Sequence, residues 1–210
     1  MQQSGLKQLT TYQRMVKRAF DLLFGSVCLV LSFPIMLLLG ILIKLDSSGP
    51  AIFKQIRVGE KGRPFQMYKL RSMTGNPTDQ LGNYGHSLAN IPINHKNDDD
   101  HRLTRMGRIL RRTSLDELPQ LLNVLKGEMS LVGPRPELPF FADQYQPWQR
   151  RRLTIPQGMT GWWQINGRDK QPMYNFTEYD LYYIDHYSFW LDLYILFKTA
   201  WVVLLGKGAF

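Results

Sequence analysis

The sequence is poor in cysteine. Its single cysteine, Cys28, lies within an apolar run, which excludes an intrachain disulfide and a metal cluster held by several thiolates. In such a run the thiol is expected to be a small buried or lipid-facing side chain.

Acidic residues are also in the minority. Asp and Glu number 17 against 26 Lys and Arg, a net charge of +9 at pH 7. This excess favours anionic partners, such as phospholipid headgroups, nucleotides or nucleic acid. Because no recognisable nucleic-acid-binding motif accompanies the charge, we expect no nucleic-acid partner. The length of 210 residues, 44% of them hydrophobic, suits one folded unit with its own core.

Charge is absent from residues 22–43, a run of 22 residues that reads LLFGSVCLVLSFPIMLLLGILI. As a helix, this run is long enough to cross the roughly 30 Å hydrocarbon core of a bilayer. It is too long for a signal peptide, and no Ala-x-Ala-like cleavage site follows it. We therefore expect the run to remain in the mature protein.

Pro34 lies near the middle of this run, where it removes a backbone donor and kinks or breaks a helix. Ser32 is placed to bond a carbonyl that the proline frees. Basic residues flank both ends of the run. An arrangement with both ends on the cytoplasmic side therefore satisfies the positive-inside rule best. The two halves, roughly 18 Å and 14 Å long, each reach about halfway through a bilayer. The sequence predicts a re-entrant helix-break-helix hairpin, with a straight or kinked span as the alternative.

A second apolar region, residues 187–205, is rich in aromatic residues and is interrupted by Asp192 and Lys198. Aromatic rings prefer the headgroup level, and charges inside a membrane span are expensive. The region is predicted as an interfacial helix, with a core helix as the alternative.

Two short strands are predicted at residues 51–58 and 65–70, separated by a Gly- and Pro-rich turn. Residues 74–101 are polar and aperiodic, which predicts a mobile surface loop. The acidic residues 98–100 in this loop are expected to be solvated rather than to bind metal.

Residues 103–112 carry apolar side chains on one helical face and arginines on another. The basic face suits lipid phosphates, and a purely solvated face is the alternative.

A further helix is predicted from about residue 114 to Gly127, with Asp116 and Glu117 at its positive end and arginines just before it. The electrostatic field of the helix N-terminus and of these arginines keeps a carboxylate ionised and attracts phosphate or Mg²⁺-phosphate. Ser114 and Glu117 have capping-box spacing, whereas Pro119 favours a later start capped by Asp116. Capping therefore remains an alternative role for both acids.

Two other segments suit recognition of phosphate or nucleotide. Pro134 and Pro136 fix the backbone around Arg135, so its guanidinium can meet a phosphate or a planar base with little entropy to lose. Residues 158–168 combine glycines with aromatic, amide and guanidinium groups. A rigid turn and an ordinary Gly-flanked strand or turn are the alternatives.

Together these motifs resemble the bacterial sugar transferase family, the monotopic phosphoglycosyl transferases, from about residue 17 to residue 210. The likeness rests on KRAFD at 17–21, YKLRSM at 68–73, SLDEL at 114–118, VGPRP at 132–136 and the segment 161–168, in family order. We therefore expect an α/β membrane-associated (monotopic) fold. Residues 1–50 would form the N-terminal segment and hairpin, 51–186 a small cytoplasmic catalytic body, and 187–210 the interfacial helix. The body is expected to be rich in amphipathic and interfacial helices, with a few short strands.

The resemblance also implies a chemistry, because in that family the Asp-Glu pair is catalytic, Mg²⁺ is required and the sugar phosphate passes through a covalent aspartyl intermediate. Carried over, Asp116 is the nucleophile and contacts Mg²⁺ together with Glu117. The predicted substrate contacts are Arg71, Arg111, Arg135, Arg168 and Asp180, the last of which matches a family acidic position without a defined role.

The implied reaction transfers a sugar-1-phosphate from a UDP-sugar to polyprenyl (undecaprenyl) phosphate with release of UMP. It would prime exopolysaccharide, capsule or O-antigen synthesis at the cytoplasmic face of a bacterial inner membrane. Residues 191–210 most resemble the hexose-1-phosphate branch, which suggests UDP-glucose or UDP-galactose as donor. Expected partners are these substrates and anionic phospholipid, with a homodimer left open. Longer relatives carry N-terminal spanning helices, so the chain is expected to be either a stand-alone core or the core of a longer protein. A non-catalytic scaffold that binds anionic lipid is the alternative.

Overall fold

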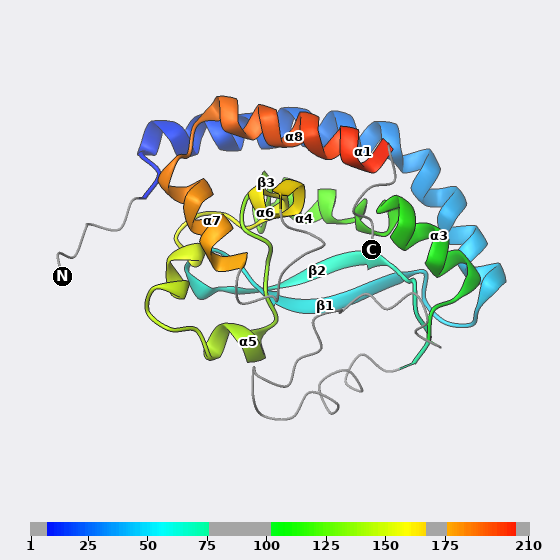
Figure 1. Cartoon of the computed structure of the whole chain (residues 1–210). Coiled ribbons are helices and arrows are strands. Elements are labelled where there is room, and N and C mark those ends of the chain that lie inside the picture. The colour runs from blue at the N-terminus through cyan, green and yellow to red at the C-terminus, as the bar shows by residue number, and fades with distance from the viewer. Residues whose placement is uncertain (1–7, 76–101, 167–175, 205–210) are drawn as a thin grey trace.

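Two long apolar helices lie along one side of a small mixed body of helices and strands (Figure 1). The structure, a computed structural model, describes residues 8–75, 102–166 and 176–204. Most of the predicted loop 74–101, with its acidic run, lies outside the described residues, as do Arg168 and the last six residues of the chain.

The first long helix, α1, runs over Thr11–Asp46 and begins with a capping box between Thr10 and Gln13. It is one helix of 36 residues with Pro34 inside, so the predicted break into two helices is wrong. Ser32 Oγ donates to the Leu29 carbonyl at 3.3 Å, one residue before the carbonyl that Pro34 leaves without its helical donor. A proline removes only one helical bond, and α1 bends towards its C-terminal end without being interrupted (Figure 1).

The outer side of α1 is apolar and exposed. The helix is long and apolar enough to cross a bilayer, yet only 17% of its most apolar stretch is buried against the body. The second long helix, α8 (Phe189–Leu204), packs beside it through an edge-to-face contact of Phe20 with Phe189, at 5.3 Å between ring centroids. We call the exposed apolar side chains of these two helices the membrane face: Leu23, Val30, Leu31, Phe33, Leu37, Leu38, Ile41, Leu45, Trp190, Phe197 and Trp201.

Both predicted strands are confirmed. Strands β1 (Ile52–Val58) and β2 (Pro64–Leu70) form an antiparallel hairpin, joined by the short 3-10 helix η1 (Glu60–Gly62). The hairpin lies below the long helices in Figure 1. A second small sheet pairs β3 (Ser130–Val132) with β4 (Gly158–Thr160) in parallel.

Short helices fill the space around the two sheets. They are α3 (Arg105–Thr113), η3 (Leu115–Glu117), α4 (Gln120–Lys126), α5 (Pro139–Asp143), η4 (Gln149–Leu153), α6 (Trp162–Asn166) and α7 (Phe176–Asp185). The helix predicted at 103–112 is confirmed as α3. Gly127 ends α4 in the left-handed conformation, as predicted.

The predicted capping roles at the start of the next helix are wrong. Ser114 is left-handed, with φ 57°, and its side chain makes no capping bond, because it serves as the C-cap of α3. The helical backbone then divides into η3 and α4, with Pro119 as the N-cap of α4. Asp116 therefore lies within η3 and does not cap α4.

Both ends of α1 are fastened to the same body. Near its start, Lys17 Nζ lies 2.7 Å from Asp192 Oδ2 of α8, and Asp21 accepts hydrogen bonds from the Ser130 hydroxyl and the Leu131 N–H of β3. At its end, Asp46 accepts from the Met106 N–H of α3 at 3.0 Å. Between these ends, α4 packs against α1. The helix therefore lies along the body over its whole length.

Candidate active site

The two predicted catalytic acids lie on η3, the short turn between α3 and α4. The left-handed Ser114 redirects the chain, so the side chains of η3 turn towards the end of β2. Asp116 is 7% exposed, which makes it one of the few buried acids of the described chain. A buried carboxylate needs compensating charge or hydrogen bonds.

That compensation comes from two cations on other elements. Lys69, next to the end of β2, places Nζ 2.9 Å from Glu117 Oε1 and 4.0 Å from Asp116 Oδ2. Arg135 places Nη2 3.0 Å from the same Glu117 oxygen. The four groups form a compact charged cluster, of which Lys69 was not among the residues predicted from the sequence.

Arg135 projects from a turn that is held from behind. Arg152 donates to the Arg135 carbonyl at 3.1 Å, and Arg57 donates to the Pro136 carbonyl at 3.3 Å. The turn also packs closely on the segment that leads into β4, because a Cβ on Gly133 would lie 2.4 Å from the Pro156 carbonyl oxygen and 2.9 Å from the Gly158 nitrogen. The turn is therefore fixed by charge-assisted bonds as well as by its two prolines.

The charge of the cluster has two consequences. The nearby Glu117 carboxylate raises the pKa of Arg135 above its ordinary value, against the opposing effect of burial, so this guanidinium remains charged at every physiological pH. The two acids and two cations sum to zero. A bound diphosphate would thus bring negative charge that the cluster does not already balance.

The site fits Mg²⁺ only in a form shared with a substrate. Among the described residues, no group of three or more His, Cys, Asp or Glu side chains is placed to hold a metal ion. Asp116 and Glu117 offer two adjacent carboxylates, and Glu117 already contacts two cations. Mg²⁺ commonly binds through one or two carboxylates, water and substrate phosphates, which matches this set.

Two predicted substrate contacts have structural partners of their own. Arg71 Nη2 donates to the carbonyl and hydroxyl of Ser47, at 2.6 Å and 2.9 Å, and so holds the end of α1. Arg111 directs its guanidinium to Ser72 Oγ at 3.4 Å and to Met73 Sδ at 2.7 Å. Their contacts with substrate stay predictions.

Asp180 of α7 is 2% exposed and lies 2.6 Å from Arg152 Nη2. Burial raises its pKa to about 6, although the Arg152 charge acts in the opposite direction. Arg152 also donates to the Arg135 carbonyl, so Asp180 is connected to the Arg135 turn through Arg152. Arg168 lies outside the described residues.

The membrane face and the charged cluster belong to one small body. The molecule thus belongs to the class of proteins that combine a long, exposed apolar helix, suited to membrane association, with a charged polar site on the same body. The chain belongs to the bacterial sugar transferase family, whose model matches residues 12–206.

Three relatives match nearly the whole chain. The UDP-N-acetylgalactosamine-undecaprenyl-phosphate N-acetylgalactosaminephosphotransferase of Aeromonas hydrophila is 41% identical over 200 residues, which cover 92% of this chain and 45% of that protein. The undecaprenyl-phosphate galactose phosphotransferase of Salmonella typhimurium is 42% identical over 204 residues, 94% of this chain and 42% of that protein. The uncharacterised sugar transferase EpsL of Bacillus subtilis is 43% identical over 193 residues, 92% of this chain and 89% of that protein. The chain thus spans less than half of the first two relatives and most of the third.

Proposed function

We propose that the chain transfers a sugar-1-phosphate from a UDP-sugar to undecaprenyl phosphate and releases UMP. The observation that carries this proposal is the Asp116–Glu117 pair held by Lys69 and Arg135, on a body attached to the membrane face. Such a site brings a carboxylate nucleophile and phosphate-binding cations to the depth of a lipid phosphate. Two of the relatives are named as undecaprenyl-phosphate sugar phosphotransferases, which agrees with this proposal.

In the first step, a carboxylate oxygen of Asp116 attacks the β-phosphorus of the donor. The bond from this phosphorus to the bridging oxygen breaks, and UMP leaves with that oxygen. The sugar phosphate is then attached to Asp116 as an acyl phosphate. In the second step, a phosphate oxygen of the lipid attacks the same phosphorus, the bond to Asp116 breaks, and the lipid diphosphate-sugar leaves with Asp116 restored.

The cations serve to reduce repulsion between reacting anions. Arg135 and Lys69 would orient Glu117 and the donor phosphates, and the rigid turn keeps Arg135 in position before substrate binds. Mg²⁺ held by Asp116, Glu117 and the diphosphate would supply the remaining positive charge. Arg111 and Arg168 are proposed as further contacts to the donor.

We also propose that α1 enters only the cytoplasmic leaflet of the bacterial inner membrane and that both its ends remain cytoplasmic. Its two ends are fastened to one body through Lys17 and Asp46, whereas a transmembrane helix must put its ends on opposite sides. A helix of 36 residues is about 54 Å long, so a position along the membrane surface keeps the whole membrane face in lipid. Of the re-entrant prediction this proposal keeps only that both ends lie on one side, because α1 is a single helix and is placed along the surface.

The test is release of UMP by the purified protein in lipid nanodiscs, with undecaprenyl phosphate, Mg²⁺ and a panel of UDP-hexoses and UDP-N-acetylhexosamines. We expect UMP release that depends on the acceptor for sustained turnover, with UDP-glucose or UDP-galactose as the preferred donor. The Asp116→Asn variant should insert and fold but lose turnover, because the shape is kept and the nucleophile is removed.

Each outcome has a defined meaning. No UMP release with any donor would reject the enzyme and favour a scaffold that binds anionic lipid. A preferred N-acetylated donor would reject only the choice of sugar. Substantial turnover by Asp116→Asn, with mass spectrometry excluding deamidation to aspartate, would remove Asp116 from its role.

A further inference from the structure

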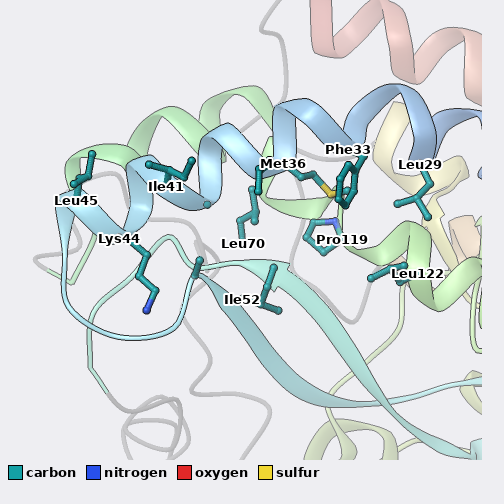
Figure 2. A pocket seen from close by; sticks show the side chains of 13 residues that line it. Leu29, Phe33, Met36, Ile41, Lys44, Leu45, Ile52, Leu70, Pro119 and Leu122 are labelled. Atoms are coloured by element: carbon teal, nitrogen blue, oxygen red, sulfur yellow. The ribbon is translucent and has the colours of Figure 1, made fainter.

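An apolar groove of about 610 Å³ runs along the inner side of α1 (Figure 2). One wall is α1 from Leu29 to Leu45, and the other is formed by Pro119 and Leu122 of the α4 region with the first and last residues of the hairpin. Twelve of its thirteen lining residues have apolar side chains or none, and the remaining one is Lys44. We call it the α1–α4 groove.

The groove is open towards lipid. Phe33, Leu37 and Ile41 line it and are also 60%, 60% and 53% exposed as part of the membrane face. Exposed apolar area of this extent on a membrane-bound protein is expected to be covered by hydrocarbon. A ligand can therefore enter sideways from the bilayer without crossing water.

The groove also reaches the catalytic turn. Pro119 follows Asp116 by three residues, and the backbone stays helical between them. Residues three apart on a helical backbone lie on the same face, so the face that carries Asp116 continues directly into the groove. In Figure 2, Phe33 and Met36 lie over Pro119, midway along the groove.

We propose that the α1–α4 groove binds the isoprenoid chain of the lipid phosphate acceptor next to its phosphate. The inference rests on the proposed function and specifies where its second substrate lies. A chain in this groove would bring its phosphate to Asp116, and the sole charged lining residue, Lys44, is a cation, which suits an anionic lipid. The groove takes only the first isoprene units, and the remainder of the chain stays in the bilayer.

Gly40 offers a sharp test, because it lines the groove and lacks a side chain. The nearest atom to a Cβ at this position is Ala51 Cβ, at 3.9 Å, so a Cβ is accommodated there, and the longer side chain of Gly40→Leu is designed to fill the groove. Leucine also favours the helix more than glycine does, which protects folding. Leu122→Trp would fill the groove from the opposite wall. Val30→Phe, which adds bulk on the exposed side of α1, is the matched control.

Two half-reactions are measured in nanodiscs. Exchange of labelled UMP into UDP-sugar without acceptor reports the donor step, and transfer to undecaprenyl phosphate reports both. Both groove variants should retain exchange and raise the KM for the acceptor about tenfold or more, a loss of about 1.4 kcal/mol per tenfold. A soluble phosphate ester with one isoprene unit should be affected less, and Val30→Phe should behave as the unmodified protein.

Unchanged acceptor kinetics in both variants would overturn the proposal, as would equal loss of exchange and transfer in both. If the groove instead holds phospholipid, the variants would carry less co-purified phospholipid with an unaltered acceptor KM. Failure of the proposed function is distinct, since the unmodified protein would then transfer no sugar phosphate at all. Transfer without exchange in the unmodified protein would reject only the covalent step, and the acceptor KM would still test the groove.

Discussion

Asp116 and Glu117 are adjacent in the chain but have different surroundings. Glu117 receives Lys69 at 2.9 Å and Arg135 at 3.0 Å, whereas Lys69 lies 4.0 Å from Asp116. A carboxylate held by two short ion pairs is stabilised as an anion and is a weaker nucleophile. The two short ion pairs suit Glu117 to fix the two cations at the site.

The residues of the site could be predicted only in part from the sequence. The acids and Arg135 lie in short motifs, and the residue types in those motifs indicate their chemistry without the fold. Lys69 and Arg71 are two positions apart at the end of a strand, so alternation gives them the same face and does not distinguish them. Their tertiary contacts distinguish them, because Arg71 binds the end of α1 and Lys69 contacts Glu117 of η3.

Asp180 should make stability depend on pH. Its pKa of about 6 in the folded chain exceeds the value of about 3.9 in an unfolded chain. The folded state therefore binds this proton more tightly, and the resulting stabilisation is present below about pH 4 and is lost as the pH rises to about 6. Asp180→Asn should thus gain stability relative to the unmodified protein over this range, by up to about 3 kcal/mol.

The measurement is the melting temperature of both proteins at several pH values in the same detergent. Asp185→Asn, an ion-pair change at the more exposed end of the same helix, should retain the original pH dependence. If the melting temperatures of Asp180→Asn and of the unmodified protein change in parallel from pH 4 to pH 6, the raised pKa of Asp180 is contradicted.

At the scale of elements, the hairpin, α3 and α8 were predictable because their periodicity and turn residues are local signals. The break in α1 was not, because a proline permits either a bend or a break. The outcome depends on what holds the two halves. In the structure, Lys17, Asp46 and Arg71 fasten the ends of α1 to elements far along the chain. No local sequence pattern specifies these contacts.

The position of α1 can be tested by cysteine labelling. In a Cys28→Ser background, Gln8→Cys and Ser48→Cys report the two ends of the helix. Because both ends are fastened to one body, neither cysteine should react with a membrane-impermeant thiol reagent in intact spheroplasts, and both should react after permeabilisation. Labelling of Gln8→Cys alone in intact spheroplasts would mean that α1 crosses the membrane.

At the scale of the whole molecule, one body joins a lipid-facing surface to a charged site. In the proposed function the membrane face would set the depth of the body, the α1–α4 groove opens from that face, and η3 carries the acids just before Pro119, which lines the groove. The arrangement suits a reaction between a water-soluble donor and a lipid acceptor, since each can approach from its own phase. A covalent intermediate on Asp116 would allow the two substrates to bind in succession at one place.

That intermediate is tested most directly by mass spectrometry of the protein mixed with UDP-sugar and Mg²⁺, without acceptor, and quenched in acid. We expect a mass increase of one sugar phosphate, located on the peptide that contains Asp116. The increase should disappear when undecaprenyl phosphate is added before the quench, and it should be absent in Asp116→Asn. If the protein shows no mass increase with donor alone and yet releases UMP when both substrates are present, the covalent intermediate is contradicted and direct transfer is favoured in its place.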